Sequence, residues 1–70
     1  MRLTFKPEST NIQEVSHDGK ALRVTFKSGN VYTYENVPVE QFHALRKADS
    51  AGTYFASHIK GKFKHTKDEK

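Results

Sequence analysis

The most informative stretch of this chain is Phe26-Lys27-Ser28-Gly29-Asn30-Val31-Tyr32-Thr33-Tyr34. Its centre, Ser28-Gly29-Asn30, is typical of a tight turn in which glycine adopts the left-handed conformation. Side chains alternate between the two faces of a strand, so the length of this turn decides which face the tyrosines occupy. A three-residue turn places them on the face of the apolar positions in the preceding strand, Leu22, Val24 and Phe26. We expect this turn, since a two-residue turn would move both tyrosines away from the core.

The residues before this stretch predict a second hairpin. Asp18-Gly19 is the strongest hairpin signal in the chain, because a type I′ turn needs positive φ at both central residues. A two-residue turn here predicts the cross-strand pairs Val15 with Leu22, Gln13 with Val24 and Glu14 with Arg23. Together the two turns predict a three-stranded antiparallel β-meander. Ahead of it, residues 1–8 fit either a short edge strand or an extended segment broken by Pro7.

Helical spacing replaces strand alternation after residue 37. Pro38 suits the first turn of a helix, where its missing N–H costs nothing. The apolar positions that follow at helical spacing are Val39, Phe42 and Leu45. This helix is expected to end near Ala48, and Asp49 or Ser50 caps a second helix with a stripe of Phe55, Ile59 and Phe63. The predicted fold class is α+β, a three-stranded antiparallel β-meander followed by two α-helices packed on one face.

Composition favours one small domain. The chain has 70 residues, no cysteine and a net charge of +4, which argues against a second domain, disulfides and thiolate metal sites. No apolar run has the length of a signal peptide or a membrane span, so we expect a soluble, cytoplasmic protein without a membrane partner. The excess positive charge lies in residues 56–70. We expect an N-terminal extended segment over 1–8, a folded domain over 9–63 and a basic, disordered tail over 64–70.

The order and spacing of several motifs resemble one known family. Residues 26–34 fit the F-x-x-G-x-x-Y-x-Y centre of the KTSC domain, named after the C-terminus of some lysyl-tRNA synthetases. Residues 48–60, which follow Val37-Pro38, resemble its second half, A-x-S-x-G-x-Y-F with a later Ile-Lys. Ser9-Thr10 stands where the family tends to have a Ser-Ser pair. Two departures are Ala56, in place of a frequent Asn, and Ser16-His17, in place of a Gly-Tyr-like pair.

The resemblance covers residues 9–63 and implies structural residues rather than an activity. The motif positions expected to build the core and its turns are Phe26, Gly29, Tyr32, Tyr34, Pro38, Ser50, Gly52, Tyr54, Phe55 and Ile59. KTSC domains occur as short stand-alone proteins and as synthetase appendages, and their biochemical role is not established. Their association with synthetases suggests RNA binding, although a shared fold does not carry function.

Two features are candidates for contact with nucleic acid. Basic side chains can track phosphates, and the candidate residues are Lys60, Lys62, Lys64 and Lys67, together with Arg23 and Lys27 of the exposed sheet face. The C-terminal lysines also fit a solvated helix end, where positive charge complements the helix dipole. Tyr32 and Tyr34 can stack on bases or fill the core, and the expected register favours the core.

Polar clusters give no support to catalysis. Ser50 and His58 lie two helical turns apart, about 12 Å along the axis, which is too far for direct proton transfer. Ser50 fits a helix cap better than a nucleophile, and Gly52 fits a position of close packing. The histidines, which are His17, His43, His58 and His65, show no metal-ligand spacing. The sequence therefore predicts no enzyme, no cofactor and no metal.

The favoured hypothesis is a small, non-enzymatic binding module that contacts RNA or another nucleic acid through a basic surface. The alternative is a protein-interaction or self-associating module that uses an uncovered strand edge or an aromatic patch on the second helix. Its motivation is the aromatic content, five Phe and three Tyr in 70 residues. We expect a monomer, with at most weak self-association.

Overall fold

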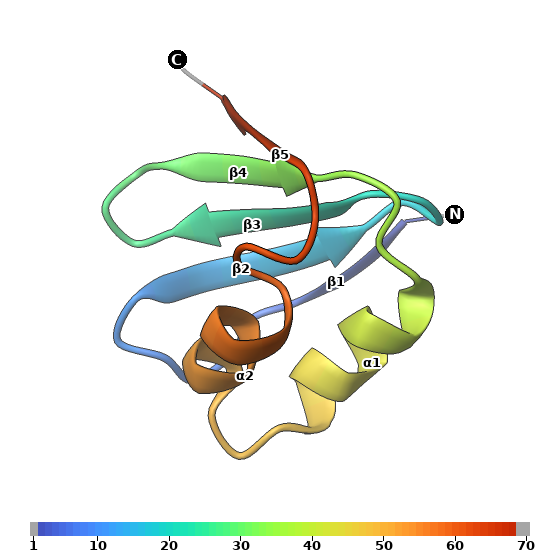
Figure 1. The fold of residues 1–70 in the computed structure, drawn as a ribbon. Helices are drawn as coiled ribbons and strands as arrows, with labels where there is room; N and C mark the ends of the chain where they lie inside the picture. Colours follow the sequence, from blue (N-terminus) through green and yellow to red (C-terminus); the bar gives the residue numbers. More distant parts are fainter. Residues whose placement is uncertain (1, 69–70) are drawn as a thin grey trace.

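The computed structural model describes residues 2–68, which form one antiparallel sheet and two helices (Figure 1). Five strands lie in the order β1-β2-β3-β4-β5. Their bounds are Leu3–Phe5 for β1, Ile12–His17 for β2, Leu22–Phe26 for β3, Val31–Tyr34 for β4 and His65–Asp68 for β5. The helices α1 (Val39–Lys47) and α2 (Ala51–His58) separate β4 from β5 in the chain. The last strand therefore returns to the sheet beside β4 after both helices are complete.

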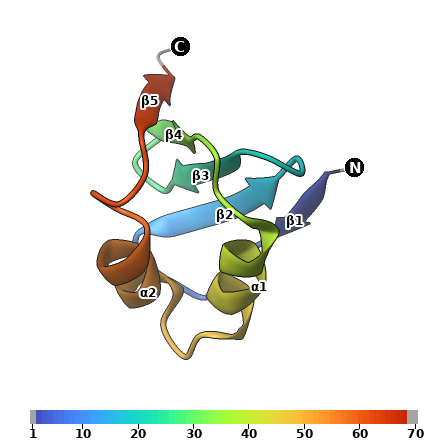
Figure 2. The same ribbon diagram turned by 45° about the vertical axis from the view of Figure 1, so that its right-hand side comes forward.

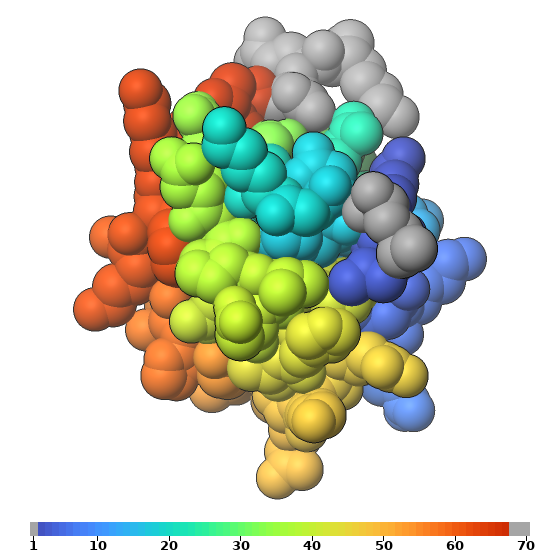
Figure 3. Space-filling view, turned by 90° about the vertical axis from the view of Figure 1, so that its right-hand side faces the viewer, coloured from blue at the N-terminus to red at the C-terminus, as the bar shows by residue number. Residues whose placement is uncertain are grey.

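Both helices lie on the same face of the sheet (Figure 2). Seen from the side of α1, this helix fills the middle of the molecule between β1 and the C-terminal segment (Figure 3). The strand register aligns Phe5, Val15, Val24 and Tyr32 in one row on the helix-covered face. The opposite face carries a polar row, made by Thr4, Ser16, Arg23, Thr33 and Thr66. One face of the sheet thus supplies the core and the other stays uncovered by helices.

The structure confirms an α+β fold with an antiparallel sheet and two helices, but the sheet has five strands, not three. The segment 1–8 contributes β1, which pairs with β2. The prediction of a disordered tail is wrong for residues 65–68, which pair with β4 along their whole length. These residues have no apolar alternation, so their strand depends on backbone hydrogen bonds that side-chain patterns do not reveal. Residues 1, 69 and 70 of the predicted terminal segments lie outside the described residues.

The turn between β3 and β4 has an odd number of residues, as expected. Tyr32 lies opposite Val24 and Tyr34 lies opposite Leu22, so both tyrosines share the core-facing side. The turn has three residues, 27–29 rather than 28–30, because the Phe26 N–H donates to the Asn30 carbonyl at 2.8 Å. Gly29 has φ +100°, the left-handed conformation that the sequence predicted.

The two-residue turn predicted at Asp18-Gly19 is wrong, because residues 18–21 form a longer loop. Val15 pairs with Val24 instead of Leu22, while Arg23 lies opposite Ser16 instead of Glu14. The Asp18 carboxylate explains the longer loop, since it accepts hydrogen bonds from the N–H groups of Ala21 (2.8 Å) and Lys20 (2.9 Å). These two hydrogen bonds hold the pKa of the Asp18 carboxyl below its usual value, and the bond from Ala21 has the larger effect.

A β-bulge in β2 also shifts the register between Ile12 and Glu14. Gln13, which the regular hairpin had predicted to lie opposite Val24, is the inserted residue of the bulge, and Val24 pairs with Val15. Ile12 and Val15 are both buried although an odd spacing would normally place them on opposite faces. The bulge resolves this conflict by inserting one residue, and it turns the start of β2 towards α2.

The helix boundaries follow local signals closely. Pro38, with φ −61°, is the residue that precedes the first turn of α1, and Ala48 ends that helix as expected. Ser50 is the cap of α2, because its side chain accepts a hydrogen bond from the Thr53 N–H at 3.3 Å. The second helix stops at His58, before Gly61, whose φ is +80°. Phe63 consequently lies outside the helix, contrary to the predicted stripe.

His17 is the most deeply buried polar side chain of the described residues, with 1% of its surface exposed. Its Nδ1 accepts a hydrogen bond from the Gly19 N–H at 3.0 Å, so Nε2 carries the proton and donates to the Val37 carbonyl at 2.6 Å. The Val37 N–H in turn donates to the Lys20 carbonyl at 2.9 Å. The imidazole therefore joins the β2–β3 loop to the segment that leads into α1.

We predict that His17→Ala lowers the free energy of unfolding by about 2–4 kcal/mol, since it leaves a cavity and two unpaired backbone groups. Urea denaturation measures this loss. His43 is exposed on α1, so His43→Ala is the matched control and should change stability by about 0.5 kcal/mol or less. Equal denaturation midpoints for the two variants would contradict the structural role of His17.

We also predict that Asp18 stabilises the fold and that this contribution is lost in acid. Because its pKa is lower in the folded state, its contribution is present above the unfolded pKa of about 4 and is lost as the pH falls through the folded pKa. Asp18→Asn should therefore flatten the loss of stability below pH 4, as followed by thermal unfolding at several pH values. Asp49→Asn serves as the control, and an identical acid profile for both variants would refute the assignment.

Candidate functional site

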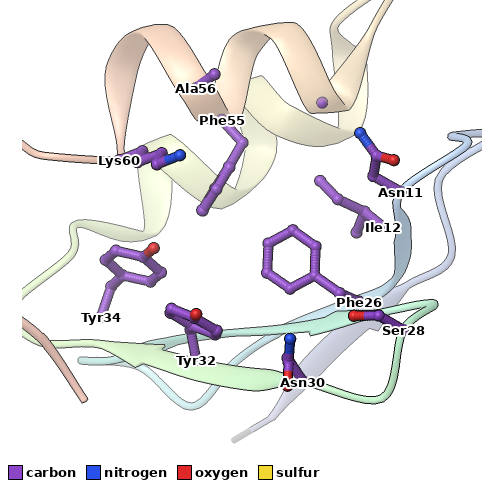
Figure 4. A pocket seen from close by; sticks show the side chains of 11 residues that line it. Asn11, Ile12, Phe26, Ser28, Asn30, Tyr32, Tyr34, Phe55, Ala56 and Lys60 are labelled. Carbon is purple, nitrogen blue, oxygen red and sulfur yellow. The ribbon is translucent and has the colours of Figure 1, made fainter. Parts of the chain in front are cut away.

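The most distinctive surface feature is a groove between α2 and the β3–β4 hairpin, with a volume of about 320 Å³ (Figure 4). We call it the aromatic groove. Its lining comes from the start of β2, the β3–β4 hairpin and α2, and consists of Asn11, Ile12, Phe26, Ser28, Asn30, Tyr32, Tyr34, Gly52, Phe55, Ala56 and Lys60. This volume is at the lower end of ligand pockets, enough for one ring system and its substituents.

Aromatic rings form the walls of the groove. Phe26 makes edge-to-face contacts with Tyr32, at a centroid distance of 5.7 Å, and with Phe55, at 5.8 Å. Tyr34 contacts Phe55 edge-on at 5.4 Å and is buried, with 2% of its surface exposed. Burial, followed by the neighbouring Tyr32, raises the pKa of the Tyr34 phenol, which keeps it neutral over a wider pH range. Tyr34 is thus a core residue, whereas Tyr32 and Phe26 are only half-buried and face the groove.

Strand β5 extends this aromatic surface beyond β4. His65 lies opposite Tyr34, and its exposed ring contacts Tyr34 at a centroid distance of 5.2 Å and Tyr32 at 5.6 Å. Lys67 lies opposite Tyr32 on the same face. The strand missing from the sequence-based prediction therefore places an imidazole and an ammonium beside the tyrosines.

The basic residues predicted to contact nucleic acid do not form one surface. Lys60 lines the groove, and Lys27 borders a hollow that shares Asn11, Phe26 and Ser28 with it. Lys67 belongs to β5 beside Tyr32. Lys60 thus lines the aromatic groove, whereas Lys27 and Lys67 lie next to residues that line it, and we refer to these three side chains as the lysine rim.

The other three predicted residues lie elsewhere. Lys62 and Lys64 are exposed in the connection between α2 and β5, where the Lys64 carbonyl accepts a hydrogen bond from the Glu35 N–H. Arg23 lies on the opposite face of the sheet, in a hollow of about 230 Å³ with Ser16 and Thr33. One ligand in the groove therefore cannot use Arg23 directly.

Sequence reasoning missed the neutral polar side chains of the groove. Asn11 precedes β2, whereas Ser28 and Asn30 belong to the β3–β4 turn, and Figure 4 shows them at the side away from Lys60. Their main chains are held by hydrogen bonds, for example from the Lys27 N–H to the Asn11 carbonyl at 2.7 Å. A turn composition of this kind normally signals local structure, so nothing in the sequence distinguished these residues from ordinary turn residues.

Ser50, Tyr54 and His58, at the start of α2 and along it, have structural partners. Ser50 caps the helix, and the Tyr54 hydroxyl donates to the Gln41 side chain of α1 at 2.8 Å. The Tyr54 ring stacks on His58 with a centroid distance of 4.2 Å. Within residues 2–68, no group of three or more His, Asp or Glu side chains is arranged to hold a metal ion. The helices found in this range are too short and too polar to span a bilayer.

Gly52 lines the groove without a steric need for glycine. Its φ is not in the left-handed region, and a Cβ added there would lie 3.5 Å from the Ser9 Oγ, which is an ordinary contact distance. The interpretation of Gly52 as a close-packing residue is therefore not required by the structure. An added methyl group would contact Ser9, and no side chain that lines the groove lies within 4 Å of it.

We predict that Gly52→Ala folds and gains up to about 1 kcal/mol in stability, because alanine favours the helix and has room. The matched variant is Gly29→Ala, whose φ of +100° is strained for alanine, so it should lose about 1 kcal/mol or more. Thermal unfolding measures both changes. A large loss of stability in Gly52→Ala would show that close packing requires this glycine.

Comparison with known proteins places these features in context. The model of the KTSC domain matches residues 8–63. The crystal structure of a KTSC domain protein from Yersinia pestis superimposes with a TM-score of 0.86 and 28% identity, over 99% of this chain and 100% of that protein.

Longer proteins also contain a similar segment. Lysine–tRNA ligases of Trichormus variabilis and Nostoc punctiforme are 42% identical over 63 residues and 43% identical over 62 residues, which is 87% and 86% of this chain. The matched segment is 11% of each ligase. An uncharacterised protein of Stutzerimonas stutzeri is 40% identical over 50 residues, 69% of this chain and 70% of that protein.

Proposed function

This chain belongs to the KTSC domain family, and on that premise we propose that it is a non-catalytic module that binds single-stranded RNA in the aromatic groove. One observation carries the proposal: the groove is walled by Phe26, Tyr32 and Phe55 and bordered by the lysine rim. Aromatic rings stack on unpaired bases, and lysines neutralise the phosphates on either side.

The charge of the groove supports an anionic ligand. Lys60 is its single charged lining residue in the described part of the chain, and no Asp or Glu side chain lines it there. The groove is also too small for a duplex, since its volume suits one ring system. An unpaired nucleotide provides a flat ring, which matches the aromatic walls, and a negative charge, which matches the lysines.

The relatives support RNA as the ligand class. The ligases that contain the similar segment act on tRNA according to their names, and the segment is a small part of each. A module of this size is suited to adding contacts with RNA outside a catalytic domain. We extend this role to the present chain because Phe26, Tyr32 and Phe55 of the KTSC motif line its groove.

The proposal predicts that Lys60→Ala weakens binding of a fluorescently labelled, short single-stranded RNA in anisotropy titrations. Removal of one phosphate contact should lower the slope of log affinity against log salt by about 0.7. Lys47→Ala, at the end of α1 and outside the groove lining, is the matched control and should leave the slope unchanged. Absence of RNA binding at low salt would end the proposal.

A protein-binding or self-associating role is the second candidate, because β1 and β5 are the two edges of the sheet. Both strands are short, and Arg2, Lys6 and Lys67 place positive charge in or next to them. Short, charged edges usually prevent strand pairing between molecules, so the structure supports this candidate less well. Concentration-dependent sedimentation would reveal it.

A further inference from the structure

The aromatic groove has two chemically different sides (Figure 4). Lys60 lies beside Tyr34 and Tyr32, where it suits a phosphate. Uncharged side chains, which are Asn11, Ser28 and Asn30, lie along the other side around Phe26. Because the charge of the lining lies on one side only, ionic contacts with phosphates do not account for the neutral side.

The neutral side chains are free to bind a ligand while their main chains are fixed. The Asn30 carbonyl accepts from the Phe26 N–H at 2.8 Å, and the Asn11 N–H donates to the Ser9 Oγ at 3.2 Å. Within residues 2–68, no hydrogen bond engages the side-chain amides of Asn11 and Asn30 or the Ser28 hydroxyl. The donors and acceptors of these side chains therefore remain available to a ligand. The backbone that carries them is held in place, which favours selective recognition of that ligand.

An amide side chain presents a donor and an acceptor in one plane, as the edge of a nucleobase does. A ring that enters the groove against Phe26 would have one edge near Asn30, whose amide nitrogen is directed into the groove (Figure 4). A purely apolar group at this position would leave the amides without partners, and a phosphate would accept from their N–H groups but offer no donor to their carbonyl oxygens. Base edges differ in their donor and acceptor patterns, so such contacts distinguish one base from another.

We infer that Asn11, Ser28 and Asn30 read the edge of one unpaired RNA base that is stacked in the aromatic groove, which makes the module base-selective. The inference rests on the proposed function and adds specificity to it. Lys60 supplies affinity for any nucleotide, whereas the neutral side supplies the preference. The two roles are separated in space, so they can be separated by mutation.

The test uses short single-stranded RNAs in which one base at a time, each of the four in turn, is flanked by abasic nucleotides. Only this base can then enter the groove, and a fully abasic strand measures backbone binding. We expect wild-type protein to bind the preferred base about tenfold more tightly than the least favoured base, within the usual range for a well-made amide–base contact. Anisotropy titrations at one fixed salt concentration give the ratios.

The double variant Asn11→Ala/Asn30→Ala should reduce this ratio to about twofold or less, without changing affinity for the least favoured base. Gln13→Ala is the matched control, since it removes an exposed amide outside the groove lining and should retain the ratio. Urea denaturation verifies that both variants fold. Lys60→Ala should weaken all four RNAs by a similar factor.

Three outcomes would overturn the inference. Equal binding of all four bases, tighter than that of the abasic strand, would leave RNA binding intact and remove selectivity. Retained discrimination in the double variant would place the recognition elsewhere. Absence of binding by any RNA, with the fold intact, would refute the proposed function together with this inference.

Discussion

The structure depends on the number of residues between β3 and β4. Because side chains alternate along a strand, the three-residue turn at 27–29 puts Tyr32 and Tyr34 on the side of Val24 and Leu22. A turn with one residue fewer would turn both rings to the open face of the sheet, and neither the core contact of Tyr34 with Phe55 nor the aromatic groove could exist. The left-handed conformation of Gly29 makes this turn possible. The conformation of one residue therefore determines both the core contact of Tyr34 and the formation of the groove.

The second constraint is the clamp formed by His17. Its ring holds the Val37 carbonyl, while the Val37 N–H is bound by the Lys20 carbonyl, so the chain leaves the sheet at a fixed point before Pro38. From there α1 packs against β2 and α2, and α2 forms one wall of the groove. Both ring nitrogens of this buried imidazole are hydrogen-bonded. The ring can therefore fix the direction of the chain as well as its position, which an apolar side chain could not do. The position of α2, and with it one wall of the groove, is thus linked through α1 to a residue that does not line the groove.

The sequence predicted features that arise from local patterns and missed those that arise from pairing. The structure confirms the facing of the two tyrosines, which follows from strand alternation. It also confirms the Ser50 cap and the end of α1, which follow from capping preference and helical spacing. The β2–β3 loop was predicted too short because the carboxylate bonds of Asp18 compete with the tighter turn. The β2 bulge and β5 gave no signal, since one is a backbone irregularity and the other a polar strand held by β4. Tyr32, Lys60 and Lys27 were identified as candidates, but not the groove that joins them.

The same residues can serve as core and as site because the helices do not cover the whole sheet. Phe55 of α2 covers Tyr34 and contacts Phe26, whereas Tyr32 extends towards β5, where His65 lies against it in the open. The aromatic cluster is therefore continuous from a buried end to an exposed end. Its buried end keeps the rings in fixed orientations, which lowers the entropy that a stacked ligand must lose on binding. In a domain of this size the core is not separate from the surface, and under the proposed function it would be the support that makes a small groove selective.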